Sequence, residues 1–249
     1  MAFFEARHLH KRFGARVVLE DISLSFAEGA VSGIMGPNGA GKTTCFHVLT
    51  GFYTPDRGEI VFEGLPITGL PPQRIARLGV SRSFQIMNLF DASAVIENVM
   101  LALPEFRARR LDVFGGVFDR PELVEPALDV LDQVGLAHRA WDKATSLSYG
   151  ERRALEIGVA LAARPRILFL DEPTSGLGSE ATKNLAVLVR RLRERYTIIM
   201  IEHDMRFLFD LAERIAVIHW GQVIAEGTPD ELQADRWVRR STLAEMADA

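Results

Sequence analysis

A glycine-rich stretch at residues 36–44, GPNGAGKTT, constrains this chain more than any other segment. It fits the pattern G-x-x-x-x-G-K-[ST], a loop whose backbone N–H groups cradle phosphates. The apolar run at residues 30–35 predicts a buried strand before the loop, and residues 43–50 predict a helix that ends at Gly51. A strand, a glycine-rich turn and a helix N-terminus form an anion site, because the free N–H groups and the helix dipole favour negative charge. A chance glycine-rich turn is the alternative, and the complete match in this context disfavours it.

The residue types in this phosphate loop fit a nucleoside triphosphate bound together with Mg²⁺. Its glycines allow positive φ and a close approach of the backbone to phosphate. Lys42 is expected to reach the β- and γ-phosphates, and Thr43 is expected to coordinate Mg²⁺. The nucleotide-binding residues expected from the loop are Gly36, Asn38, Gly39, Ala40, Gly41, Lys42, Thr43 and Thr44.

Two adjacent carboxylates follow a second apolar strand, in the sequence RILFLDE at residues 166–172. Open α/β sheets bind ligands at the carboxyl ends of their strands, which is where this acidic pair falls. We expect Asp171 to hold Mg²⁺, directly or through water, and Glu172 to orient and deprotonate an attacking water. A solvated acidic turn is the alternative, and the phosphate loop elsewhere in the chain disfavours it.

The segment LSYGE at residues 147–151 precedes a helical run at residues 152–163. Ser148 is the expected N-cap, and Glu151 lies three residues further on, so the pair has the spacing of a capping box. The simpler interpretation is only the beginning of a helix. The more specific interpretation is a second helix N-terminus that binds a phosphate.

Hydrophobic periodicity divides the chain and predicts an α/β fold. Strand-like alternation marks the N-terminal region, helical spacing begins at residue 86, and strands alternate with helices again from residue 165. We therefore expect a nucleotide-binding core with an N-terminal antiparallel β subdomain (residues 1–85 and 165–227), an inserted α-helical subdomain (86–164) and a short C-terminal tail (228–249).

Composition narrows the classes of function. The chain has 249 residues, of which 48% are hydrophobic, enough for the core of one large domain or two small lobes. A net charge of -4 argues against general binding of nucleic acid. The single cysteine, Cys45, excludes an internal disulfide and fits a reducing cytoplasm. No apolar run approaches the ~20 residues of a membrane-spanning helix, and the N-terminus has no signal-peptide pattern.

Taken in order, these motifs resemble those of the ATP-binding cassette (ABC) ATPases along essentially the whole chain. Residues 36–44 resemble the Walker A motif, residues 147–151 the ABC signature (usually LSGGQ), and residues 167–172 the Walker B motif with its catalytic glutamate. Three further matches, taken one at a time, are more typical of a surface amide, a strand-end histidine and a core aromatic, but their joint order favours the family. These matches are Gln85 at the Q-loop glutamine, His203 at the switch histidine and Phe13 at the aromatic position that stacks on adenine.

The resemblance implies a P-loop NTPase (RecA-like) fold in a single ABC ATPase domain over residues 1–249, with two such cassettes facing each other head to tail. Each ATP would lie between the phosphate loop of one cassette and Ser148 and Gly150 of the other. Hydrolysis would open the pair, and membrane-embedded permease subunits would convert closure into alternating access. The cassette would then be peripheral, on the cytoplasmic face of the plasma membrane. The implied catalytic residues are Glu172, His203 and Gln85, and the implied Mg²⁺ ligands are Thr43, Gln85 and Asp171.

Within the family, the chain most resembles importers of branched-chain amino acids and related solutes, including urea. The resemblance lies in residues 147–151, 155–157, 201–205 and 224–229. It implies a periplasmic solute-binding protein as an indirect partner, and a second cassette that is either another copy or a different ATPase. One alternative is the ATPase of an exporter or lipid-extraction system. The other is a soluble ABC ATPase linked to nucleic acid, which the single cassette and the negative charge disfavour.

Three positions depart from the family pattern. Tyr149 replaces a signature glycine, and Glu151 replaces the signature glutamine. Both changes are tolerable if the hydroxyl of Ser148 and the backbone of Gly150 make the contacts. Gly178 stands in the D-loop, where the family usually has Asp or Asn, and its effect is either looser coupling between the two sites or one less active site.

Overall fold

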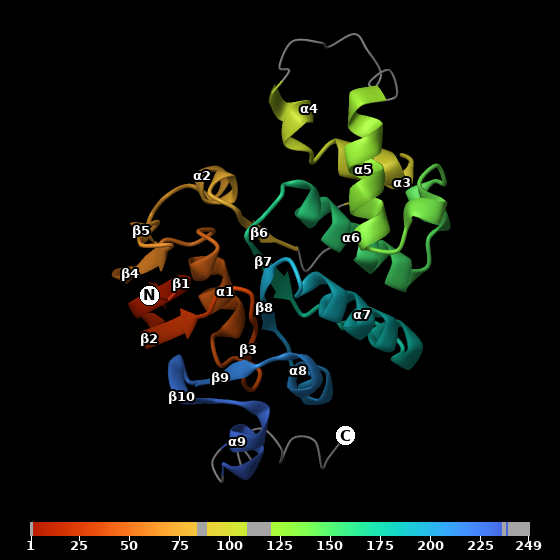
Figure 1. Cartoon of the computed structure of the whole chain (residues 1–249). Helices are drawn as coiled ribbons and strands as arrows, with labels where there is room; N and C mark the ends of the chain where they lie inside the picture. Colours follow the sequence, from red (N-terminus) through yellow and green to blue (C-terminus); the bar gives the residue numbers. More distant parts are fainter. Residues whose placement is uncertain (1, 84–88, 109–120, 236–237, 239–249) are drawn as a thin grey trace.

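The computed structural model (Figure 1) describes residues 2–83, 89–108, 121–235 and 238. Its central element is a six-stranded sheet with the order β10-β9-β3-β8-β7-β6. All neighbouring strands in this sheet are parallel except the β9–β10 hairpin. The strands are β3 (Val31–Met35), β6 (Val80–Arg82), β7 (Ile167–Asp171), β8 (Thr197–Ile201), β9 (Arg214–His219) and β10 (Gln222–Gly227).

A second, antiparallel sheet has the order β2-β1-β4-β5 and forms the N-terminal part of the fold. Its alternating sequence works as predicted, because Ile22, Leu24 and Phe26 are buried while the serines between them are exposed. The strands are β1 (Phe4–Phe13), β2 (Arg16–Phe26), β4 (Arg57–Phe62) and β5 (Leu65–Pro66).

The central sheet is covered on both faces, which explains why its strands are continuous apolar runs rather than alternating ones. All five residues of β7 are buried. Ile167 and Phe169 join a hydrophobic cluster with α1 (Lys42–Leu49) and the antiparallel sheet. The intervening Leu168 and Leu170 join the other cluster. That second cluster includes residues of α6 (Tyr149–Ala162), α7 (Ser179–Leu192) and α8 (Met205–Leu211).

The described part of the predicted helical insertion contains helices, short 3-10 turns and one isolated β-bridge between Ala94 and Lys143. Figure 1 shows α3, α4 and α5 grouped at one end of the molecule, away from the antiparallel sheet. The apolar side chains Leu123, Ala127 and Leu131 of α5 are buried, as their helical spacing predicts. The elements here are α3 (Val95–Met100), α4 (Pro104–Ala108), α5 (Pro121–Gln133), η2 (Ala137–Arg139) and η3 (Ala144–Ser146).

Two short helices complete the described fold, α2 (Pro72–Arg77) and α9 (Pro229–Ala234). The α/β fold class is confirmed, and the ends of elements differ from the sequence expectation by a few residues. For example, the sequence predicts a helix from residue 180 to about residue 195, and the structure has α7 over Ser179–Leu192. No helix in the described ranges is both long and apolar enough to cross a membrane.

Candidate functional site

The phosphate loop connects the carboxyl end of β3 to the start of α1, as its sequence predicts. Gly36 has φ 152° and Gly41, the N-cap of α1, has φ 102°. A Cβ atom on Gly36 would lie 2.0 Å from the Ile218 carbonyl oxygen, and one on Gly41 would lie 2.8 Å from the Val18 carbonyl oxygen. Only glycine fits these two positions, so the backbone can form the concave turn that a phosphate requires.

Lys42 is the first residue of α1 and is only 6% exposed. Its ammonium group donates to two carbonyl oxygens of the phosphate loop itself, Gly36 at 2.7 Å and Pro37 at 3.0 Å. The positive charge is therefore held over the loop, at the N-terminus of a helix whose first turn has no acidic residue. Both features favour a bound polyphosphate. The side chain of Thr43, next along the helix, is exposed.

Asp171 ends β7, is 2% exposed and lies in register with Ile201 of β8. Its Oδ1 atom is buried and has no hydrogen-bond partner among the residues that the structure describes. Burial, followed by the neighbouring charge of Glu172, raises the pKa of Asp171 to about 6. A buried, unpartnered carboxylate oxygen at a strand end fits Mg²⁺ chemistry. The described residues contain no group of three or more His, Cys, Asp or Glu that could hold a metal. A cation here would therefore need phosphate or water as further ligands.

We predict that Asp171→Asn stabilises the nucleotide-free protein at neutral pH. The raised pKa means that ionised Asp171 costs folding free energy, a cost that appears as pH rises above the unfolded value and is complete above about 6. The amide should gain about 2 kcal/mol at pH 7.5 and almost nothing near pH 4. Thermal unfolding at both pH values without Mg²⁺ measures this gain. Lower stability of the variant at both pH values would contradict the raised pKa of Asp171.

Glu172 has φ 42°, a left-handed backbone conformation that is uncommon for a non-glycine residue. Two hydrogen bonds hold this backbone. The Glu172 N–H donates to the Ile201 carbonyl at 2.9 Å, and the Glu172 carbonyl accepts from Arg153 Nη2 at 2.8 Å. Its carboxylate stays partly exposed at 22%. The surrounding structure thus maintains the strain and presents a carboxylate at the strand end.

His203 follows β8 and lies beside Glu172, although they are 31 residues apart in the sequence. Its Nδ1 atom is 3.9 Å from Glu172 Oε2 and 4.0 Å from Glu202 Oε2, and its side chain is 57% exposed. The structure thus brings together an exposed imidazole and a carboxylate at neighbouring strand ends, as expected for groups that act on one ligand.

Two buried charged residues support this arrangement, and the sequence analysis did not identify either of them. Glu202 accepts backbone hydrogen bonds from Thr174 at 2.8 Å and His203 at 3.1 Å, while burial raises its pKa. Arg153 in α6 donates to the carbonyl oxygens of Glu172 and Pro173 and pairs with buried Glu156. A charged pair at i and i+3 on the apolar face of a helix was the available signal for Arg153.

Phe13 ends β1 and is 45% exposed. Its ring packs edge-on against Tyr53, with 5.2 Å between ring centroids, and Tyr53 donates a backbone hydrogen bond to His47 in α1. Phe13 therefore contacts the segment directly after the phosphate-loop helix, while part of its ring surface stays open. A partly open aromatic ring surface fits stacking on a base.

The capping box predicted before α6 is present, with Ser148 as its N-cap. The Glu151 N–H donates to Ser148 Oγ at 3.3 Å, and the Ser148 N–H donates to Glu151 Oε2 at 2.8 Å. Tyr149 reaches the D-loop, where its hydroxyl donates to the Ser175 carbonyl at 3.3 Å. A cleft of about 700 Å³, lined in part by Ser148, Gly150 and Gly178, lies between this helix start and α7. Gln85 lies outside the described residues.

Comparisons with known proteins give a consistent result. A family model described as ABC transporter matches residues 19–175. The chain is 39% identical to the high-affinity branched-chain amino acid transport ATP-binding protein LivG of Salmonella typhimurium, over 95% of this chain and 96% of LivG. It is 35% identical to the lipopolysaccharide export system ATP-binding protein LptB of Acidithiobacillus ferridurans, over 97% of each chain.

Solved structures agree in fold. The ADP conformation of MJ1267, an ATP-binding cassette of an ABC transporter, has a TM-score of 0.87 and 29% identity over 98% of this chain and 99% of that one. The dimeric structure of MJ0796, a bacterial ABC transporter cassette, has a TM-score of 0.74 and 25% identity over 91% and 98% of the two chains.

A phosphate loop and an acidic strand end on a mostly parallel sheet define a P-loop nucleotide hydrolase. The full-length similarities are more specific, and the chain belongs to the ABC transporter family as one of its ATP-binding cassettes. The cassettes of this family hydrolyse ATP to power transport.

Proposed function

We propose that this chain is the ATP-hydrolysing subunit of a membrane importer that takes up branched-chain amino acids or a related small solute. The observation that carries the proposal is the convergence of three strand ends, which bring the phosphate loop, the Asp171–Glu172 pair and His203 to one edge of the sheet. The similarity to LivG supports the solute class.

In this proposal, each described residue at the sheet edge has a separate task in ATP hydrolysis. The phosphate loop and Lys42 bind the triphosphate, and Phe13 stacks on adenine. Thr43 and Asp171 would hold Mg²⁺, which would supply positive charge to neutralise the phosphates. Glu172 accepts a proton from the attacking water, and His203, beside that carboxylate, orients the reacting group. Gln85, which is outside the described residues, is a further Mg²⁺ and catalytic position.

We further propose that two cassettes share each ATP. The start of α6, with Ser148 and Gly150, belongs to a different part of the chain from the phosphate loop and contacts the triphosphate held by a second cassette. The dimeric structure of MJ0796 supports such a pair. The catalytic core comprises residues 1–85 and 165–227, the helical subdomain comprises residues 86–164, and residues 228–249 form the tail. Permease subunits in the membrane bind the pair at the cytoplasmic face, and a periplasmic protein delivers the solute to them.

The decisive experiment is uptake by the complete transporter. The chain is produced with candidate permease and solute-binding subunits and reconstituted in proteoliposomes containing ATP and Mg²⁺. We expect ATP-dependent accumulation of radiolabelled leucine or urea, with a Lys42→Ala complex as the inactive control.

Similarity to LptB supports a second candidate, an ATPase that drives lipid export. Neighbouring genes for export components, together with ATP-dependent release of lipopolysaccharide and no solute uptake in the same assay, would favour this function over the importer.

Gly178→Asp is predicted to change the coupling of hydrolysis to transport more than it changes ATP affinity. Gly178 is the N-cap of α7, with φ -77°, and a Cβ atom there meets nothing within 4 Å, so aspartate fits without strain. As an N-cap it should stabilise the chain by about 0.5 kcal/mol. We expect equal or higher Tm, unchanged ATP affinity and an altered ratio of solute moved to ATP hydrolysed. A change confined to ATP affinity would contradict a D-loop role.

A further inference from the structure

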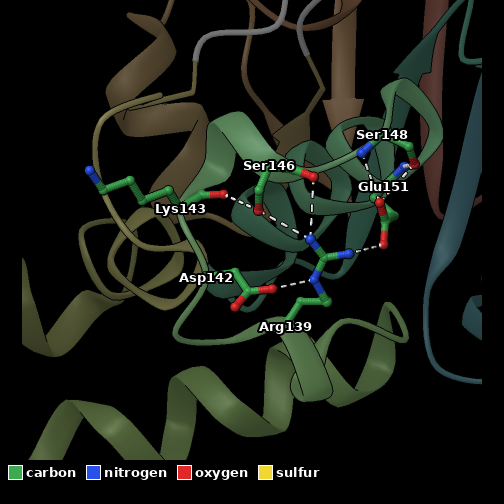
Figure 2. A network of polar contacts seen from close by, with 6 residues as sticks. All are labelled: Arg139, Asp142, Lys143, Ser146, Ser148 and Glu151. Carbon is green, nitrogen blue, oxygen red and sulfur yellow. Dashed lines mark hydrogen bonds and ion pairs between the residues drawn. The ribbon is translucent and has the colours of Figure 1, made fainter.

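Arg139, the last residue of η2, is the centre of a polar network at the start of α6 (Figure 2). Its Nη1 donates to Glu151 Oε1 at 3.0 Å, and its Nη2 donates to the Ser146 hydroxyl at 3.1 Å. Its Nε donates to the Asp142 carboxylate. With donors engaged on three sides and the side chain only 25% exposed, the guanidinium group has a fixed orientation.

The two oxygens of the Glu151 carboxylate have different partners. Oε2 accepts from both the backbone N–H and the hydroxyl of Ser148, each at 2.8 Å, while Oε1 faces Arg139. Burial opposes ionisation of this carboxyl, but the bonds from Ser148 and the charge of Arg139 outweigh it and lower the pKa of Glu151. A full negative charge therefore lies next to the hydroxyl of Ser148 at neutral pH.

This charge conflicts with the role that the proposed function gives to Ser148. The Ser148 hydroxyl has a single proton, so it must turn from Glu151 Oε2 to donate to a triphosphate oxygen. That oxygen would still lie within about 6 Å of Glu151 Oε2, because two contacts of about 3 Å separate them. Two anions that close repel each other unless a cation lies beside them. Among the described residues, Arg139 is the cation that forms an ion pair with Glu151. Asp142, on the other side of the guanidinium group, is 48% exposed, so solvent screens its charge.

We propose that Arg139 is a positioning residue of the shared nucleotide site, which compensates the charge of Glu151 so that Ser148 can receive the triphosphate of a second cassette. The inference rests on the proposed pairing of cassettes. It explains how this signature segment combines a carboxylate at position 151 with an anionic ligand. Arg139 itself does not touch the nucleotide.

A double-mutant cycle of Arg139 and Glu151 tests whether Arg139 acts through its charge or through its structural contacts. All variants are made in the Glu172→Gln background of the full-length chain. Analytical ultracentrifugation measures its ATP-dependent pairing with a second cassette, which is either another copy of this chain or a different ATPase. We expect Arg139→Gln to weaken ATP-dependent pairing about tenfold. Glu151→Gln should be tolerated, and adding it to Arg139→Gln should restore pairing to within about twofold of Glu151→Gln alone. Arg139→Lys, which keeps the charge, should retain most of the pairing.

Three controls separate this mechanism from a structural role of Arg139. Asp142→Asn removes the charge of another partner of Arg139 and should leave pairing unchanged. ATP affinity of the single cassette should be equal in all variants, and the Arg139→Gln defect should shrink as salt rises. A double variant that pairs as poorly as Arg139→Gln, or a defect that salt leaves unchanged, would overturn the proposal. Failure of the Glu172→Gln parent to pair with either cassette would instead refute the proposed function.

Discussion

Glu172→Gln is expected to bind ATP with unchanged affinity and to hydrolyse it about 10²–10³-fold more slowly, because the amide cannot accept the proton of the attacking water. Structural disturbance should be small. Glutamine has the same shape and carries the same left-handed backbone, which the bonds to Ile201 and Arg153 hold from both sides. Unhydrolysed ATP should then accumulate between two cassettes. The variant, alone or mixed with the different ATPase that it pairs with, should therefore elute as a dimer on size exclusion with ATP and as a monomer without it.

Glu194→Gln is the matched control for this experiment. Glu194 is exposed beyond the end of α7, so the same change of one carboxylate to an amide should leave kcat within about twofold of the parent. Near-normal hydrolysis by Glu172→Gln would show that another group accepts the proton. If Glu172→Gln formed an ATP-dependent dimer but kept normal hydrolysis, the pairing of cassettes would not depend on the loss of hydrolysis.

Lys42→Ala is expected to lower ATP affinity about 100-fold. Lys42 is 6% exposed, and its ammonium group is held over the phosphate loop by the carbonyl oxygens of Gly36 and Pro37. Truncation removes a charge-assisted contact to phosphate in a site shielded from water, where such bonds are worth about 1.5–3 kcal/mol each. Isothermal titration calorimetry with ATP measures the loss. Binding of adenosine, which has no phosphate, should change little.

Lys183→Ala is the control for Lys42→Ala, because Lys183 is exposed in α7. Its removal takes away one positive charge without touching the phosphate loop. ATP affinity of this variant should match the parent within about twofold. Equal ATP affinity in Lys42→Ala and the parent would mean that the loop does not bind the triphosphate.

Much of the fold and part of the site could be predicted from the sequence because the signals are local. The phosphate loop needs glycines at fixed offsets, and the capping box of Ser148 and Glu151 spans four residues, so both are visible in a short window. The strand before Asp171 was equally clear, because a strand buried on both faces is a continuous apolar run.

The remaining part of the site depends on contacts between distant segments, which a single sequence does not reveal. Glu202 accepts from the backbone of Thr174, and Arg153 reaches the carbonyl of Glu172 from another helix. These partners are backbone atoms, which any residue provides. The i, i+3 pair of Arg153 with Glu156 indicates a buried charge but does not indicate that Arg153 reaches Glu172. Arg139 could not be predicted from the sequence for the same reason, because its contact with Glu151 depends on where η2 lies relative to α6.

The two hydrophobic clusters on opposite faces of the central sheet have a consequence for hydrogen exchange. Amides in the middle of β3, β7 and β8 are hydrogen-bonded to neighbouring strands and covered on both sides. Water should reach them only when the whole protein unfolds, so they should be the slowest amides to exchange deuterium. The phosphate loop, Glu172 and His203 all follow the ends of these strands. The proposed catalytic groups are thus anchored to the part of the chain that is expected to exchange most slowly, which limits how far thermal motion can displace them.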